Sequence, residues 1–151
     1  MSNYPEKIKK ITKEFFKKAD FLVDASIEEE KGTLFVKIKT DDPQILIGQN
    51  GQTLAEIQKL LRALVKKSIE GEFFIDVDIN NYKQKKAEYL KETAREAANE
   101  VFLSQKEKTL PAMPSYERRV VHVELADRSD VVVESIGEEP NRRIVIKPTL
   151  S

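Results

Sequence analysis

The chain has 151 residues, with 26 basic and 26 acidic side chains, one histidine and no cysteine. These numbers exclude a disulfide framework, a thiolate metal site, a cysteine nucleophile and a site with several histidine ligands. The length fits one ordinary domain or two small ones. Because the net charge is zero, any binding of phosphate must come from local basic patches, and we expect it to be modest.

Neither the apolar runs nor the first residues are typical of a membrane or secreted protein. No apolar run approaches the roughly 20 residues that a helix needs to cross a bilayer. The first ten residues, MSNYPEKIKK, are charged and lack the apolar core of a signal peptide. We therefore expect a soluble, cytoplasmic protein without membrane insertion.

The first half of the chain alternates between helical and strand-like patterns. Apolar residues at helical or alternating spacing predict, in order, a helix, two strands, a short helix, a longer helix and a strand, at residues 5–19, 21–30, 32–40, 41–47, 52–68 and 72–80. Lys31 and Gly32 form the expected hairpin turn between the two strands. The buried face of the longer helix is predicted to consist of Leu54, Ile57, Leu61, Leu64 and Val65.

The second half predicts a separate α+β unit. It contains a long helix over 81–108, a proline-containing segment, a helix over 116–126 that Ser115 caps, and two strands over 130–136 and 142–148. The long helix should bury a stripe consisting of Leu90, Ala94, Ala97 and Val101, with Ala87, Ala98 and Phe102 beside it. We place the boundary near residue 80, which gives two domains, 1–80 and 81–151.

The sequence GQNG, from Gly48 to Gly51, lies just before the helix over 52–68. Glycines at this place let another backbone approach the unpaired N–H groups and the positive end of the helix dipole. Such a site suits a phosphate-bearing chain. The alternative is a corner between two helices that needs positive φ angles and binds nothing. The turn fits neither a Walker loop nor a dinucleotide fingerprint.

The elements around this turn resemble a KH domain of the type II arrangement, in which a GXXG loop between two helices clamps about four nucleotides. The resemblance implies that the clamp consists of Gly48, Gln49, Asn50 and Gly51. It also implies an apolar groove for bases, whose candidate residues are Ile45, Ile47, Leu54 and Ile57; the alternative for each is plain core packing. Loops of this kind often include Lys or Arg, and this one does not. The candidates to supply the missing charge are Lys59, Arg62 and Lys66.

The lone histidine lies in the segment ERRVVHVEL. Arg118 and His122 are four residues apart, so they share one face of the predicted helix, and Arg119 points about 100° away from Arg118. A guanidinium group and an imidazole side by side suit a phosphate, because both donate hydrogen bonds to it. The alternative is an ordinary surface or half-buried histidine.

An arginine, three residues and a histidine on a helix, followed by a hairpin, resemble the R-three-H domain, a small fold that binds single-stranded nucleic acid. With the KH-like unit ahead of it, the chain is similar to the Jag (SpoIIIJ-associated) family of bacterial RNA-binding proteins from about residue 20 to residue 148. Many members of that family carry an extra N-terminal domain, which we expect this chain to lack.

The resemblance implies that Arg118 and His122 contact phosphate, with Arg119 nearby and Arg142 and Arg143 extending the patch. It leaves open whether Tyr116 stacks on a base or packs at the start of the helix. The residues expected to fix the hairpin loop are Gly137, Glu138 and Pro140.

Taken together, these patterns favour a cytoplasmic binder of single-stranded RNA, or of single-stranded DNA, that acts as a post-transcriptional regulator without a cofactor. The alternative is a protein-interaction adaptor, in which the KH unit forms a homodimer or pairs with a small single-KH protein. An enzyme is not expected. His122 with Glu117 or Glu124, and Asp76 with Asp78, form no plausible nucleophile–base pair or metal cluster.

Overall fold

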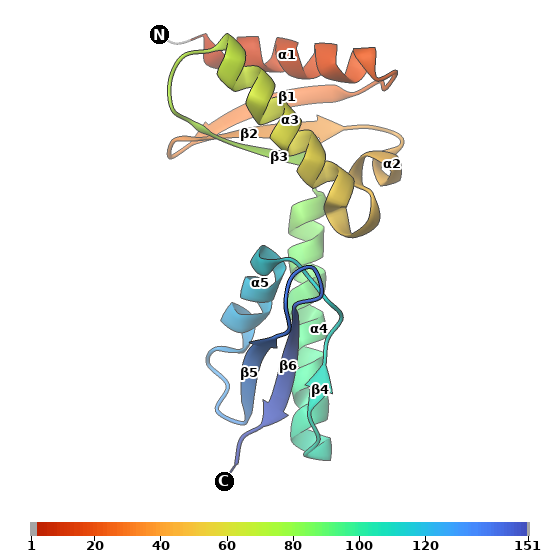
Figure 1. Ribbon diagram of the computed structural model, residues 1–151, viewed down its shortest axis with the longest axis vertical. Helices are drawn as coiled ribbons and strands as arrows, with labels where there is room; N and C mark the ends of the chain where they lie inside the picture. The colour runs from red at the N-terminus through yellow and green to blue at the C-terminus, as the bar shows by residue number, and fades with distance from the viewer. Residues whose placement is uncertain (1–2, 151) are drawn as a thin grey trace. The chain divides into compact units, whose positions relative to one another are not determined.

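The computed structural model describes residues 3–150 and divides the chain into two compact units, the first ending at Lys83 and the second beginning at Gln84 (Figure 1). Both units combine helices with a small sheet, so the predicted α+β class is confirmed. Within the described part of the chain, no helix is both long enough and apolar enough to span a membrane.

The first unit has the predicted order of elements. These elements are α1 (Tyr4–Lys18), β1 (Asp24–Glu30), β2 (Thr33–Lys39), α2 (Pro43–Ile47), the 3-10 turn η1 (Gln49–Gly51), α3 (Gln52–Ser68) and β3 (Phe74–Ile79). The central strand β2 pairs antiparallel with β1 and parallel with β3. Lys31 and Gly32 have φ angles of 49° and 83°, which a tight hairpin turn requires. This order agrees with the KH resemblance, and the KH assignment itself stays a prediction.

The core of the first unit lies between the sheet and the helices α1 and α3 (Figure 1). The strands bury alternate residues, as their period of two requires. Helix α3 buries Leu54, Ile57, Leu61 and Val65. The prediction for Leu64 was wrong, because this side chain is 39 % exposed. It lies beside α1 instead of facing the sheet and lines a groove there together with Leu60.

The second unit packs a helix pair against a small antiparallel sheet (Figure 1). Its elements are α4 (Tyr82–Ser104), which enters this unit at Gln84, β4 (Lys108–Thr109), α5 (Ser115–Leu125), β5 (Val131–Ile136) and β6 (Arg143–Pro148). Strand β6 is central, between β4 and β5. The predicted stripe of α4 is buried in the core, together with Ala98.

Three expectations for the second unit were wrong. Helix α4 ends at Ser104 instead of residue 108, because Gln105 takes a left-handed conformation with φ of 59°, and β4 follows. Phe102 is 50 % exposed, since the small sheet covers only a narrow stripe of α4. Ser115 is the first residue of α5 and makes no side-chain cap; Pro114 takes the N-cap position in an extended conformation.

Candidate nucleic-acid interface

The glycine turn of the first unit depends on both glycines for its shape. Gly48 has φ of 73° and ψ of −178°, a conformation that is essentially confined to glycine. A Cβ atom there would overlap Thr53 Oγ1 and lie 2.9 Å from the Thr53 backbone nitrogen. Gly51 has φ of 77°, and a Cβ atom there would lie 3.1 Å from Tyr82 Cε2. Both glycines are therefore explained by backbone geometry, whatever the turn binds.

The accessible part of this turn consists of its two middle residues. Gly51 is buried and Gly48 is half-buried, whereas Gln49 and Asn50 are exposed. Asn50 has φ of 56°, which asparagine tolerates better than most residues. No side chain caps the N-terminus of α3. Of the four predicted clamp residues, Gln49 and Asn50 are thus the ones whose side chains face solvent.

Most of the residues predicted to form the apolar groove are buried or half-buried in the core instead. Leu54 and Ile57 are 2 % and 6 % exposed and pack against the sheet. Ile47 is half-buried at the edge of the same core, and only Ile45 presents most of its side chain to solvent. For Leu54 and Ile57, the structure supports plain core packing.

Polar side chains of α3 cover the free edge of β3. Arg62 Nε donates a 3.0 Å hydrogen bond to the Ile75 carbonyl, and Gln58 Oε1 accepts one of 2.9 Å from the Val77 N–H. Lys83 completes this layer, with Nζ 2.9 Å from Gln58 Oε1 and 2.7 Å from Asp76 Oδ1. Arg62 is therefore oriented by the sheet edge.

The three cations of α3 that were predicted to supply charge differ in their surroundings. Lys59 is exposed, and its Nζ lies 3.9 Å from Glu56 Oε1, one helical turn away. Arg62 and Lys66 line a cavity of about 780 Å³ together with Phe73 and Phe74. Phe74 is 76 % exposed, so this cavity combines cations with an accessible aromatic ring. Phe74 was not among the predicted site residues, although its place on the outward side of the alternating strand pattern indicated an exposed aromatic ring.

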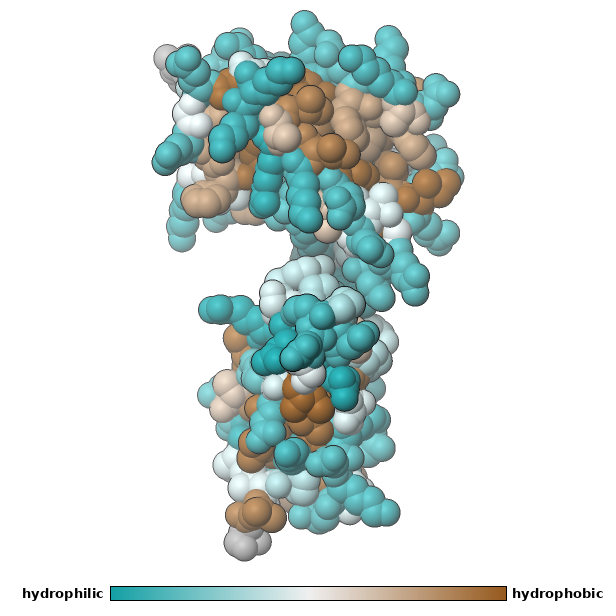
Figure 2. Space-filling model, viewed as in Figure 1, coloured by the Kyte–Doolittle hydropathy of each residue, from teal (hydrophilic) through white to brown (hydrophobic). Residues whose placement is uncertain are grey.

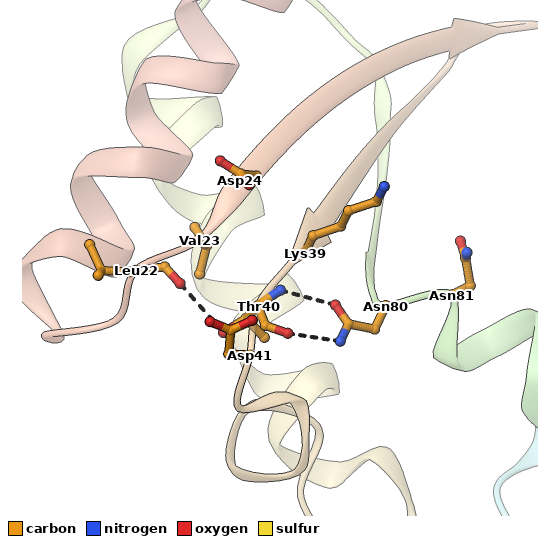
Figure 3. A pocket seen from close by; sticks show the side chains of 8 residues that line it. All are labelled: Leu22, Val23, Asp24, Lys39, Thr40, Asp41, Asn80 and Asn81. Carbon is orange, nitrogen blue, oxygen red and sulfur yellow. Dashed lines mark hydrogen bonds between the residues drawn. The ribbon is translucent and has the colours of Figure 1, made fainter.

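A further cavity of about 610 Å³ lies at the end of the first sheet (Figure 3). The Asn80 amide bridges the backbone of Thr40, accepting from its N–H at 3.0 Å and donating to its carbonyl at 2.9 Å. Asp24, Asp41 and Lys39 also line this cavity (Figure 3). Two carboxylates against one ammonium group make this a poor place for a phosphate.

In the second unit, the arginine of the Arg-x-x-x-His pair is buried. Arg118 is 7 % exposed; its Nη1 donates to the Met113 carbonyl at 2.7 Å, and its Nη2 lies 2.9 Å from Glu139 Oε1. His122 is half-buried, with Nε2 3.1 Å from the Ser135 hydroxyl of β5. Both residues thus lie on the inner side of α5, where they connect the helix to the β5–β6 hairpin.

Three guanidinium groups contact residues 137–141 of the loop between β5 and β6. Arg118 pairs with Glu139, Arg142 Nη1 donates to the Gly137 carbonyl at 2.7 Å, and Arg143 Nη1 donates to the Asn141 carbonyl at 3.2 Å. The exposed side chain of Arg119 makes no hydrogen bond or ion pair with any residue that the structure describes. Arg119 is thus the accessible cation of this predicted patch.

A buried carboxyl group lies beside the Arg-x-x-x-His pair. Glu117 is 2 % exposed, its Oε1 lies 3.8 Å from Lys86 Nζ, and its Oε2 has no hydrogen-bond partner among the described residues. Burial raises the pKa of Glu117, while Lys86 and Tyr116 lower it in part. The burial of Glu117 was not predicted, although Glu117 lies four and eight residues before Val121 and Leu125, which are buried on the same face of α5.

Comparisons with known proteins agree with the features of the second unit. The model of the R-three-H domain matches residues 88–148. Three relatives named RNA-binding protein KhpB come from Clostridium symbiosum, Bacillus subtilis (strain 168) and Lactiplantibacillus plantarum, and are 36%, 31% and 29% identical to this chain. The matches cover 87%, 82% and 82% of this chain and 60%, 60% and 39% of those proteins.

The chain therefore spans about two to three fifths of the length of these curated relatives. Within that span the alignments cover most of both units. The Jag resemblance seen in the sequence is confirmed: the chain is a relative of the KhpB proteins of that family, and residues 88–148 form its R-three-H domain.

Proposed function

We propose that this chain binds single-stranded RNA and acts as a post-transcriptional regulator in the cytoplasm of a bacterium, without catalytic activity and without a cofactor. The observation that carries the proposal is that three arginines of an R-three-H domain contact one short loop, with the exposed Arg119 on the helix that carries Arg118. Guanidinium groups bind phosphate through paired hydrogen bonds. The names of the KhpB relatives support RNA as the nucleic acid.

The first unit supplies the second RNA-binding surface in this proposal. The exposed residues Gln49 and Asn50 precede a helix N-terminus that no side chain caps. Backbone N–H groups and the helix dipole favour an anion there. Lys59, Arg62 and Lys66 continue the surface along α3, where Phe74 offers a ring on which a base can stack.

Two modest surfaces on one chain reinforce each other. When one surface holds the RNA, the other meets it at a high effective concentration. Binding to a single strand loses affinity with salt at a slope of about −0.7 per neutralised phosphate. With few clustered cations, we expect about three to five such contacts and hence a shallow slope.

The proposal is tested by fluorescence anisotropy of the full chain with short labelled RNA of several sequences, at low and physiological salt. Single-stranded DNA of the same sequences and duplex RNA serve as comparison ligands. We expect saturable binding of single-stranded RNA that weakens with salt. No binding of any single-stranded RNA at low salt would overturn the proposal, and equal binding of DNA would remove the preference for RNA.

A single isosteric change tests the role of the glycine turn. The substitution Gln49→Glu adds a negative charge at an exposed position and leaves both glycines in place. We expect RNA affinity to fall about threefold, because the new carboxylate repels the phosphate that approaches α3. Anisotropy titrations at low salt measure the change.

Ser68→Asp is the matched control, because it adds the same charge at an exposed residue at the other end of α3. It should change the affinity much less than Gln49→Glu. Equal losses for the two variants would show that only the net charge matters and that the turn makes no contact with RNA.

The apolar groove between α1 and α3 favours a second candidate function, self-association. The groove is lined by Ile11 and Phe15 from α1 and by Leu60 and Leu64 from α3, and Figure 2 shows apolar surface between these helices. Leu60 is 53 % exposed and Leu64 is 39 % exposed. We propose a homodimer through this face as the alternative, with a small KH-like protein as the competing partner.

The substitution Leu60→Lys tests this candidate. We expect the wild-type chain to sediment as a dimer at micromolar concentration, with little dependence on salt, and Leu60→Lys to sediment as a monomer. The exposed Lys59→Ala is the control, since it lies next to Leu60 but outside the groove. A monomeric wild type would contradict the homodimer.

A further inference from the structure

The ion pair between Arg118 and Glu139 joins two side chains of very different exposure. The Arg118 side chain is 8 % exposed and the Glu139 side chain is 60 % exposed, with Nη2 and Oε1 2.9 Å apart. Arg118 is also held from the inner side, where its Nη1 donates to the Met113 carbonyl at 2.7 Å. The guanidinium group is thus fixed, while its carboxylate partner lies at the surface.

From this asymmetry we propose that Glu139 occupies the place at Arg118 that an RNA phosphate takes, so that RNA binds this unit by displacing the Glu139 carboxylate. This inference rests on the proposed function. A carboxylate and a phosphate diester present the same kind of oxygen acceptors to a guanidinium group. Glu139 therefore competes with RNA for Arg118 and lowers the affinity.

The energetics allow this exchange. The exposed Glu139 carboxylate is well solvated by water when it leaves. The buried Arg118 is not left without a partner, because the phosphate replaces the carboxylate. The hydrogen bond to the Met113 carbonyl still orients the Arg118 guanidinium group when the carboxylate leaves. Arg142 and Arg143 contact the Gly137 and Asn141 carbonyls on either side of Glu139. The segment that carries Glu139 thus also accepts hydrogen bonds from two further guanidinium groups.

The same geometry explains how a buried arginine contributes to binding. Arg118 is almost fully buried, and the carboxylate that neutralises it belongs to the exposed Glu139. A ligand that replaces Glu139 gains a guanidinium group whose position is already fixed. The ion pair therefore opposes binding: an RNA phosphate must interact with Arg118 more favourably than the Glu139 carboxylate does.

The substitution Glu139→Gln tests the inference, with Glu138→Gln as the matched control. The Glu138 side chain is exposed and forms no hydrogen bond or ion pair with any described residue. We expect Glu139→Gln to raise the affinity for single-stranded RNA by about two- to fivefold and Glu138→Gln by clearly less. The salt slope should steepen by up to about 0.7 in Glu139→Gln alone, because the charge of Arg118 then has no carboxylate partner before RNA binds.

Side-chain NMR of Arg118 gives an independent readout that does not depend on affinity. The Nε–H signals of wild type and Glu139→Gln should differ without RNA and coincide with saturating RNA, because a phosphate replaces residue 139 in both. Equal gains for the two glutamine variants, or bound-state signals that remain as different as the free ones, would overturn the inference. A failure of the proposed function would give a different result. If neither the wild type nor Glu139→Gln binds RNA at low salt, the proposal of RNA binding itself is wrong.

Discussion

Replacing Gly48 by alanine is expected to lower the free energy of unfolding of the first unit by about 3 kcal/mol. The left-handed φ of 73° with an extended ψ is nearly closed to other residues, and the new Cβ atom would overlap the Thr53 side chain. Thr53 lies in the first turn of α3, so relief of the overlap has to move the start of that helix. Amide hydrogen exchange at the buried Val36 and Ile38 of β2 measures the loss in the full chain.

The control for this prediction is Gly32→Ala. Gly32 also has a positive φ, at 83°, but a Cβ atom there meets no other atom within 4 Å. Gly32→Ala should lower the free energy of unfolding by about 1 kcal/mol, which is the penalty for a left-handed backbone alone. If the two variants lose the same stability, the contact with Thr53 is harmless and the turn is less constrained than its geometry indicates.

The second large effect is expected from Arg119→Glu, which should weaken the binding of single-stranded RNA about tenfold. A charge-assisted hydrogen bond to phosphate is worth about 1.5–3 kcal/mol, and the substitution replaces its donor by a repelling carboxylate. Arg119 makes no described contact within the protein, so the fold should be unaffected. Anisotropy titrations over a range of salt should also show a slope that is shallower by about 0.7.

Lys106→Glu makes the same change of charge at an exposed residue just after α4. It should alter RNA affinity by less than about twofold if the effect of Arg119 is local. Circular dichroism spectra and melting temperatures of both variants should match those of the wild type. If the two substitutions weaken RNA binding equally, the affinity depends on the net charge of the chain and not on a contact between RNA and α5.

Hydrophobic periodicity predicted the helices and strands well because both units bury simple one-sided patterns. Helix α3, at Gln52–Ser68, agrees with the expected range, and α5 begins one residue earlier than expected. The short strand β4 was missed, since two exposed residues carry no alternating pattern. The exposure of Leu64 and Phe102 was also missed. It depends on how much of each helix its neighbours cover, which the helix sequence alone does not contain.

The surroundings of the predicted site residues differ from what spacing implies. Spacing placed Arg118 and His122 on one face of a helix, and both do lie on the inner side of α5. Spacing could not show that this side is buried, because that depends on the Met113 carbonyl and on the loop that carries Glu139. The assignment of all these residues to RNA contacts stays a prediction for the experiments above.

The arginine contacts on the loop over 137–141 also affect the entropy of binding. A free arginine side chain loses up to about 2 kcal/mol of rotamer entropy when a ligand immobilises it. Arg118, Arg142 and Arg143 already donate to backbone carbonyls, so part of this freedom is lost when the protein folds. In the proposed complex, association with RNA would then immobilise fewer side chains, and the rigidity of these three arginines would offset the lack of a net positive charge.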